Sequence, residues 1–128
     1  MADKTKILMI DDEEDFSYAV RLNLEKTGKF TVVTALKGEE GIKLAKSEKP
    51  DLILLDLIMP GMDGGQVAAQ LLDSDSTKKI PIIFLTALAQ KEQVEACDGK
   101  IGGRDYIAKP VAPDELIARI ESVLGERA

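Results

Sequence analysis

The 128-residue sequence contains no histidine and a single cysteine, Cys97. Without histidine, the chain cannot build a Ser–His–Asp triad, use imidazole in general acid–base catalysis or bind a metal through a ring nitrogen. One cysteine cannot form an internal disulfide, and such sparse use is compatible with a reducing compartment. Any metal site must therefore consist of oxygen ligands, or of one thiolate and oxygens.

Long apolar runs and an excess of positive charge are also missing. No stretch approaches the roughly 20 apolar residues that cross a bilayer, and the N-terminus lacks the apolar core of a signal peptide. We therefore expect a cytoplasmic protein that does not contact membranes. The formal net charge of −6 argues against direct nucleic-acid binding, because such binding needs clustered lysine and arginine.

The overall composition is that of a soluble globular domain, with 45% hydrophobic and 31% charged residues. The length suggests a single domain over residues 1–128, and no internal repeat or linker divides the chain. Because the last expected helix runs to the end of the sequence, we expect a stand-alone domain without a downstream output domain.

Short apolar runs alternate with helical patterns along the chain. The runs predict five strands, at residues 6–10, 30–34, 52–55, 81–85 and 106–108. The helical patterns predict five helices, around residues 16–24, 38–47, 63–72, 88–98 and 113–124. Continuously apolar strands need cover on both faces, which favours a parallel sheet between helix layers. Five such units are too few for an eight-fold barrel, so we expect an open, doubly wound α/β fold.

Polar side chains follow four of the five predicted strands. Asp11 and Asp12 follow the first, Asp56 the third, Thr86 the fourth and Lys109 the fifth. In open α/β sheets, ligands bind outside the carboxyl ends of the strands. Three carboxylates there would repel each other unless a divalent cation joined them, and oxygen ligands suit Mg²⁺ best, with Mn²⁺ or Ca²⁺ as alternatives. A carboxylate nucleophile, a metal, a lysine and a hydroxyl predict phosphoryl transfer through an aspartyl phosphate.

Four motifs in order resemble the receiver domain of bacterial response regulators. They are Ile10-Asp11-Asp12, Leu54-Leu55-Asp56 with Met59-Pro60-Gly61-Met62-Asp63-Gly64, Leu85-Thr86-Ala87, and Asp105-Tyr106 leading to Lys109-Pro110. Each motif is weak alone, but together they are specific and cover nearly the whole chain. The resemblance implies a flavodoxin-like receiver fold with strand order 2-1-3-4-5 and five helices.

The resemblance also implies a phosphoacceptor and a set of metal ligands. Asp56 would accept the phosphoryl group. Asp12 and Asp56 would bind Mg²⁺ directly, together with the backbone carbonyl of Ile58. Asp11 would act mainly through a coordinated water.

Other positions would respond to the phosphoryl group. Thr86 would donate a hydrogen bond to one of its oxygens, and Lys109 would pair with it, or with Asp56 before it arrives. The Lys109–Pro110 bond would be cis. Tyr106 would rotate inward as Thr86 moves, which would change the surface formed by the fourth helix, the fifth strand and the fifth helix.

The implied function is a signalling switch in a two-component phosphorelay. A histidine kinase or phosphotransfer protein would supply the phosphohistidine, since this chain has no histidine. The domain would catalyse only its own phosphorylation and dephosphorylation, and would not be an enzyme for other substrates. It would act on a downstream target protein, as a monomer or a phosphorylation-dependent dimer.

Two other functions fit the sequence less well. A phosphatase resembling the haloacid dehalogenase family needs a second acid two residues after its nucleophile, where this chain has Ile58. A phosphorylation-independent adaptor usually lacks part of the acid set, the threonine or the lysine, all of which are here; it stays as the alternative. Purely structural interpretations are helix-terminal charge for Asp11 and Asp12, a helix cap for Thr86 and core packing for Tyr106.

Two apolar positions suggest a long-lived phosphorylated state. Ile58 lies two residues after Asp56, and Leu88 lies two residues after Thr86. Both would flank the path of a water molecule attacking the aspartyl phosphate. Because neither side chain can hydrogen-bond that water, we expect slow hydrolysis.

Overall fold

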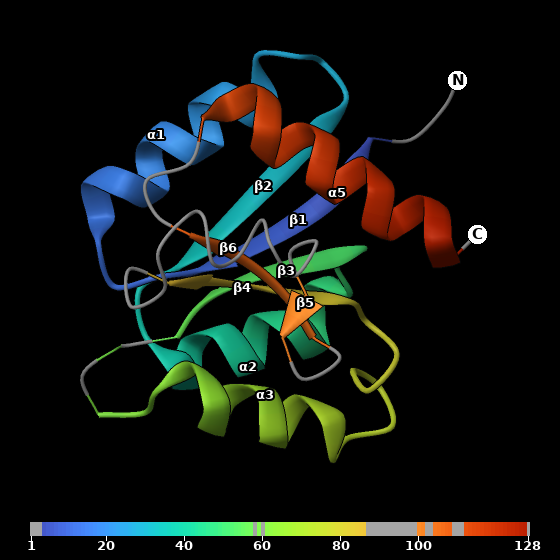
Figure 1. Cartoon of the computed structure of the whole chain (residues 1–128). Helices are drawn as coiled ribbons and strands as arrows, with labels where there is room; N and C mark the ends of the chain where they lie inside the picture. Colours follow the sequence, from blue (N-terminus) through green and yellow to red (C-terminus); the bar gives the residue numbers. More distant parts are fainter. Residues whose placement is uncertain are drawn as a thin grey trace.

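The computed structural model of the chain describes residues 4–57, 59, 61–86, 100–101, 104–108 and 112–127. Its helices are α1 (Glu14–Glu25), α2 (Gly38–Glu48), α3 (Gly64–Leu72) and α5 (Pro113–Arg127). Its strands are β1 (Thr5–Ile10), β2 (Phe30–Ala35), β3 (Leu52–Asp56), β4 (Ile82–Thr86), β5 (Lys100–Ile101) and β6 (Arg104–Ala108). The sheet lies between two helix layers, α1 with α5 on one face and α2 with α3 on the other (Figure 1). This arrangement confirms the doubly wound α/β fold.

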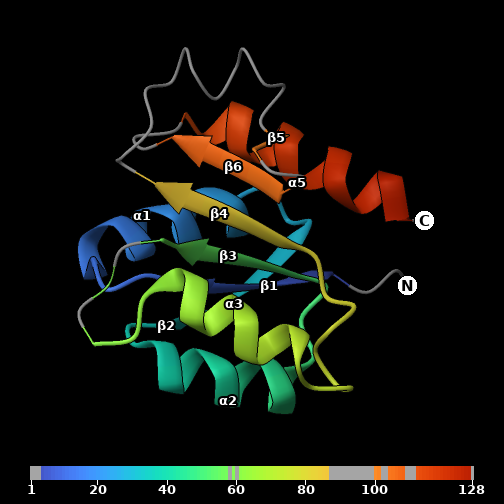
Figure 2. The same cartoon turned by 60° about the horizontal axis from the view of Figure 1, so that its bottom comes forward.

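The parallel strands follow the expected order, which the structure labels β2-β1-β3-β4-β6. Figure 2 shows them side by side across the sheet. A sixth strand, β5, adds at the β6 edge in the antiparallel direction, with Lys100 opposite Asp105. The sequence did not predict β5, because two residues are too few to show a periodic pattern. The helix predicted at residues 88–98 lies outside the described residues.

The core explains why the strands are apolar without interruption. Alternate residues of β1 and β3 face α1 and α5, and the residues between them face α2 and α3. The first set is Ile7, Met9, Leu52 and Leu54, and the second is Leu8, Ile10, Ile53 and Leu55. All eight are fully buried, so each strand contributes to two hydrophobic layers. Among the helices of the described residues, none combines the length and apolar character needed to cross a bilayer.

The outer edge of β2 is protected by a carboxylate from α1. Glu25 Oε2 accepts a hydrogen bond from the Val32 backbone N–H at 3.1 Å, and its Oε1 lies 3.2 Å from Arg21 Nε. The bond from Val32 is the main cause that holds the pKa of Glu25 below its usual value of 4.5. The ionised carboxylate therefore favours the folded state.

Replacing Glu25 with glutamine should remove a pH-dependent part of the stability. Since the folded pKa is lowered, the contribution of the carboxylate is present above about pH 4.5 and is lost as the pH falls through the folded pKa. We expect the wild type to exceed Glu25→Gln by at most about 1 kcal/mol at neutral pH, because the carboxylate stays partly solvated. Urea unfolding between pH 6 and 3 should show the difference shrinking. A difference that does not change with pH would contradict this assignment.

Candidate metal centre at the carboxyl ends of the strands

Three carboxylates meet where β1 and β3 end. The two strands are neighbours, with Ile10 opposite Leu55, so the residues that follow each of these lie side by side. One carboxylate oxygen from each of Asp11, Asp12 and Asp56 lies within 4.8 Å of the others. Among the described residues, this is the sole group of three or more acidic, histidine or cysteine side chains close enough to hold a metal. The structure thus brings together the three acids that the sequence placed at strand ends.

The acids of this cluster differ in exposure. Asp11 is fully buried, Asp56 is 4% exposed and Asp12 is exposed. Charged carboxylates this close repel each other, and burial strengthens the repulsion because the interior screens charge less than water does. The donor set consists of oxygens only, which is the set that Mg²⁺ and similar hard cations prefer. The residues present therefore fit a divalent cation, with Asp12 on the solvent side.

The backbone on either side of the cluster is held by the sheet. The Asp11 N–H donates to the Ala35 carbonyl at 3.0 Å, and the Leu57 N–H donates to the Leu85 carbonyl at 2.9 Å. Asp11 Oδ1 also accepts the Glu13 N–H at 2.8 Å, which ties the acid to the entry of α1. These bonds come from different strands, so the relative position of Asp11 and Asp56 depends on the sheet itself.

Helix α3 begins beside this cluster with a capping box. Asp63 Oδ1 accepts the Gln66 N–H at 2.9 Å, and Gln66 Oε1 accepts the Asp63 N–H at 3.0 Å. Asp63 is therefore the N-cap of α3. One residue further, the Gly64 N–H donates to the Leu57 carbonyl at 2.9 Å, which links the start of α3 to the end of β3.

Tyr106 lies half-buried on β6 and stacks on Phe84 of β4, with ring centroids 5.1 Å apart and planes 24° apart. It packs with the hydrophobic cluster on the α2 and α3 face. This position agrees with the packing interpretation of Tyr106, and its role in switching stays a prediction.

Several predicted site residues fall outside the part of the chain that the structure describes. They are Ile58, Leu88, Lys109 and Pro110. Thr86 ends β4 opposite Ala108, at the same end of the sheet as the acids, but its side chain is also outside the described atoms. The carbonyl ligand, the cis bond and the contacts to a phosphoryl group therefore stay predictions.

Two residues near the acids were not assigned a role from the sequence. Ser17 is buried, and its hydroxyl lies 3.4 Å from the Asp11 carbonyl oxygen, to which it donates. The sequence signal for Ser17 was its helical spacing from Val20 and Leu24, which places a hydroxyl on the apolar face of the predicted helix. The sequence places Gly64 in a receiver motif without a role of its own, although it lies against the backbone of Asp56.

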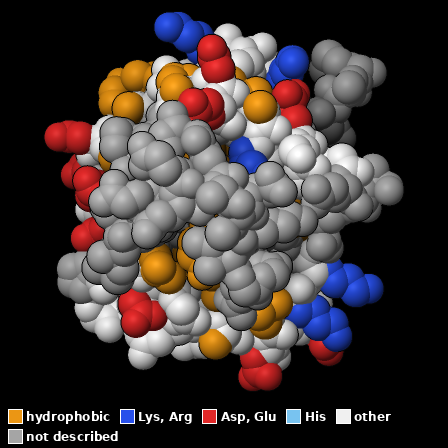
Figure 3. Space-filling model, viewed as in Figure 1, with side chains coloured by type: hydrophobic (Ala, Val, Ile, Leu, Met, Phe, Trp, Pro, Cys, Tyr) orange, Lys and Arg blue, Asp and Glu red, His pale blue; other side chains and the backbone are white. Residues whose placement is uncertain are grey.

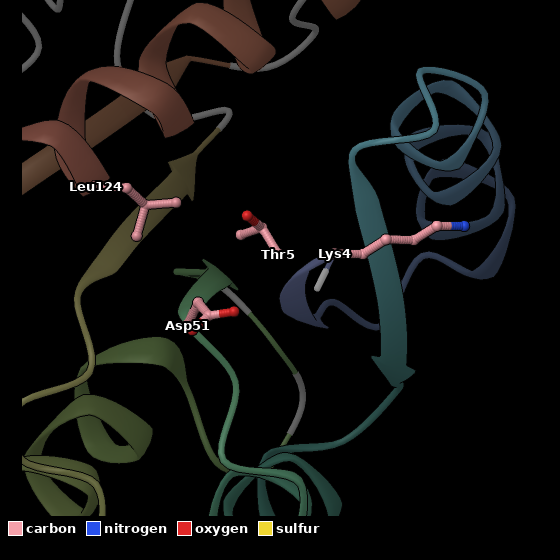
Figure 4. Close-up of a pocket in the computed structure, with 4 residues that line it drawn as sticks. All are labelled: Lys4, Thr5, Asp51 and Leu124. Carbon is pink, nitrogen blue, oxygen red and sulfur yellow. The ribbon is translucent and has the colours of Figure 1, made fainter. Parts of the chain in front are cut away.

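Acidic residues at the start of α1 flank the cluster, and a hollow lies elsewhere on the surface. Acidic side chains gather over the start of α1 in the space-filling view (Figure 3), where Glu14 and Asp15 occupy the first turn. A hollow of about 360 Å³ is lined by Lys4, Thr5, Asp51 and Leu124 (Figure 4). It lies where β1 and β3 begin, at the opposite end of the strands from the carboxylates.

The chain is similar to known proteins over most of its length. A family model described as response regulator receiver domain matches residues 7–121. The alkaline phosphatase synthesis transcriptional regulatory protein PhoP of Bacillus subtilis is 42% identical over 93% of this chain and 48% of its own length. Protein PilH of Pseudomonas aeruginosa is 39% identical over 94% of this chain and 98% of its own length.

A solved structure shows the same architecture. Chemotaxis protein CheY4 of Vibrio cholerae is similar with a TM-score of 0.80 at 26% identity, covering 94% of this chain and 99% of that one. The chain spans about half the length of several curated relatives that it matches, PhoP among them, and nearly all of PilH.

Proposed function

This chain belongs to the response regulator receiver family, whose members are signalling domains of two-component systems, and we propose that Asp56 is its phosphoacceptor. The observation that carries the proposal is the buried carboxylate of Asp56 within 4.8 Å of Asp11 and Asp12. Asp12 and Asp56 would bind Mg²⁺ directly with the Ile58 carbonyl, and Asp11 would bind it through water. We further propose that residues 1–128 form a single receiver domain.

In the proposed reaction, a carboxylate oxygen of Asp56 attacks the phosphorus of a phosphohistidine. The bond between phosphorus and the ring nitrogen breaks, and the donor imidazole leaves with the electron pair and takes up a proton. Bound Mg²⁺ supplies charge neutralisation at the phosphoryl oxygens. Burial of Asp56 limits access of water to the acyl phosphate. Thr86 would donate a hydrogen bond to a phosphoryl oxygen, and Lys109 would neutralise another.

The partners follow from what the chain lacks. A histidine kinase or phosphotransfer protein must supply the phosphohistidine, because this chain contains no histidine. The output would pass through the helix predicted at residues 88–98, β6 and α5 to a downstream protein target, with Tyr106 as the side chain that links Thr86 to that surface. The domain would act on no substrate other than itself.

The proposal is tested by incubating the protein with a small phosphodonor and Mg²⁺ and measuring its intact mass. We expect the mass of one added phosphoryl group, and no addition when a chelator replaces Mg²⁺. A protein that gains no phosphoryl group with Mg²⁺ present would refute the phosphoacceptor role and favour a phosphorylation-independent adaptor.

The identity of residue 58 should control how long the phosphoryl group remains. Replacing Ile58 with asparagine would place an amide beside the path of an attacking water. One hydrogen bond worth about 1 kcal/mol in the transition state corresponds to roughly fivefold faster hydrolysis. The rate is measured as loss of the added mass after the donor is removed.

Ile58→Val is the matched control, because valine is also apolar and should leave the rate near that of the wild type. Leu88→Glu tests the second position in the same assay. If neither polar substitution accelerates the loss, the apolar pair does not explain the lifetime.

A further inference from the structure

We infer that Gly64 is a positioning residue for the Asp56 carboxylate, an inference that rests on the proposed function. Gly64 is the first residue of α3 and is buried. A Cβ at this position would lie 2.8 Å from Leu57 Cα and closer still to the carbonyl oxygen of Asp56. Both are backbone atoms of the strand end that carries the acceptor, so they cannot move aside as a flexible side chain could.

Glycine is needed here for space rather than for backbone conformation. Gly28 and Gly61 have positive φ angles, and Gly64 is not in that group. A backbone hydrogen bond also joins the two segments, since the Gly64 N–H donates to the Leu57 carbonyl at 2.9 Å. The start of α3 therefore lies directly on the backbone of Asp56 and Leu57.

A side chain at position 64 would disturb the site because β3 is held from its other side. Leu57 donates to the Leu85 carbonyl at 2.9 Å, and Asp56 lies opposite Leu85 in the register of β3 and β4. A Cβ must either push the end of β3 against these bonds or lift α3 away. The first shift carries the Asp56 carboxylate with it, and the second breaks the bond from the Gly64 N–H to the carbonyl of Leu57, the residue that follows Asp56.

The other two acids would not follow that shift. Asp11 is tied through its N–H to the Ala35 carbonyl and through Oδ1 to the Glu13 N–H. Asp12 follows Asp11 on the same segment. Displacing Asp56 alone would change the separation of the three oxygens, which now lie within 4.8 Å of one another.

Gly65 supplies a matched control one residue away. It is exposed, and a Cβ there would meet only the Asp63 carboxylate oxygen, at 3.3 Å. Gly65→Ala thus makes the same chemical change in the same helix turn without touching β3. Leu71→Ala is the second control, because it opens a cavity at the far end of α3 and lowers stability without contact to Asp56.

The experiment measures Mg²⁺ affinity in the absence of any phosphodonor, followed by the phosphorylation rate at saturating Mg²⁺. Mg²⁺ binding is read from backbone amide shifts of the full chain during titration, and folding from the thermal midpoint. For Gly64→Ala we expect both the affinity and the rate to fall roughly 10- to 100-fold, as for a misplaced reacting group. Gly65→Ala should stay within about twofold of the wild type, and Leu71→Ala should lose thermal stability while keeping its Mg²⁺ affinity.

Each other outcome is decisive. Gly64→Ala with the affinity and rate of Gly65→Ala would overturn the inference. A Gly64→Ala protein that does not fold, beside a folded Gly65→Ala protein, would assign Gly64 to folding and also overturn it. If the Mg²⁺ affinity falls equally in Gly64→Ala and Leu71→Ala, general destabilisation of the fold explains the loss, and Gly64 does not position Asp56. If the wild type binds Mg²⁺ but is not phosphorylated, the proposed function fails, while the Mg²⁺ titration still decides the role of Gly64.

Discussion

Asparagine at position 56 is expected to abolish the stable gain of a phosphoryl group from a small donor with Mg²⁺. Asparagine has nearly the shape of aspartate, so the packing at this 4% exposed position should be preserved. Its amide carries no negative oxygen that could attack phosphorus and form an acyl phosphate. Intact mass over a time course, with wild type and Asp56→Asn in parallel, measures the effect.

Asp15→Asn is the matched control for this substitution. Asp15 lies in the exposed first turn of α1 and is not one of the three clustered acids. The Asp15→Asn variant should therefore gain a phosphoryl group as the wild type does. If Asp56→Asn still gains a phosphoryl group, another side chain is the acceptor, and peptide mapping would identify it.

The parts of this site that could be predicted depend on local sequence. The run from Leu52 to Leu55 is apolar because β3 is buried on both faces. The end of this apolar run marks the end of the strand, so the position of Asp56 could be predicted without knowledge of the fold. Asp63 is followed at the capping-box spacing by Gln66, which is also a local signal. The convergence of Asp11 and Asp56 needed one further assumption, that their strands are parallel neighbours.

The parts that could not be predicted depend on contacts between distant segments. Gly64 and Gly65 are identical in sequence terms, yet only Gly64 lies against β3, because the direction in which α3 leaves the loop decides which glycine faces the strand. The bond from Val32 to Glu25 depends in the same way on how α1 packs beside β2. Strand β5 has only two residues, and its pairing with β6 leaves no periodic signal.

Replacing Asp12 with asparagine is expected to have two effects of opposite sign. Without divalent cations, the free energy of unfolding should rise by about 1 kcal/mol, because one of three mutually repelling charges is removed. With Mg²⁺, the affinity should fall about tenfold or more, since the ligand loses its charge. The exposed position of Asp12 makes the substitution compatible with the fold.

Urea unfolding in chelator and in saturating Mg²⁺ would measure both effects. A cation that binds only the folded state adds about 2.7 kcal/mol at 100 times its dissociation constant, so the wild type should gain more from Mg²⁺ than Asp12→Asn does. The order of stability should therefore reverse between the two conditions. Asp15→Asn should lower stability slightly in both, because it removes a favourable charge from the start of α1. If Mg²⁺ does not stabilise the wild type, or if Asp12→Asn is no more stable than the wild type in chelator, the three carboxylates do not form the strained cation site that their spacing implies.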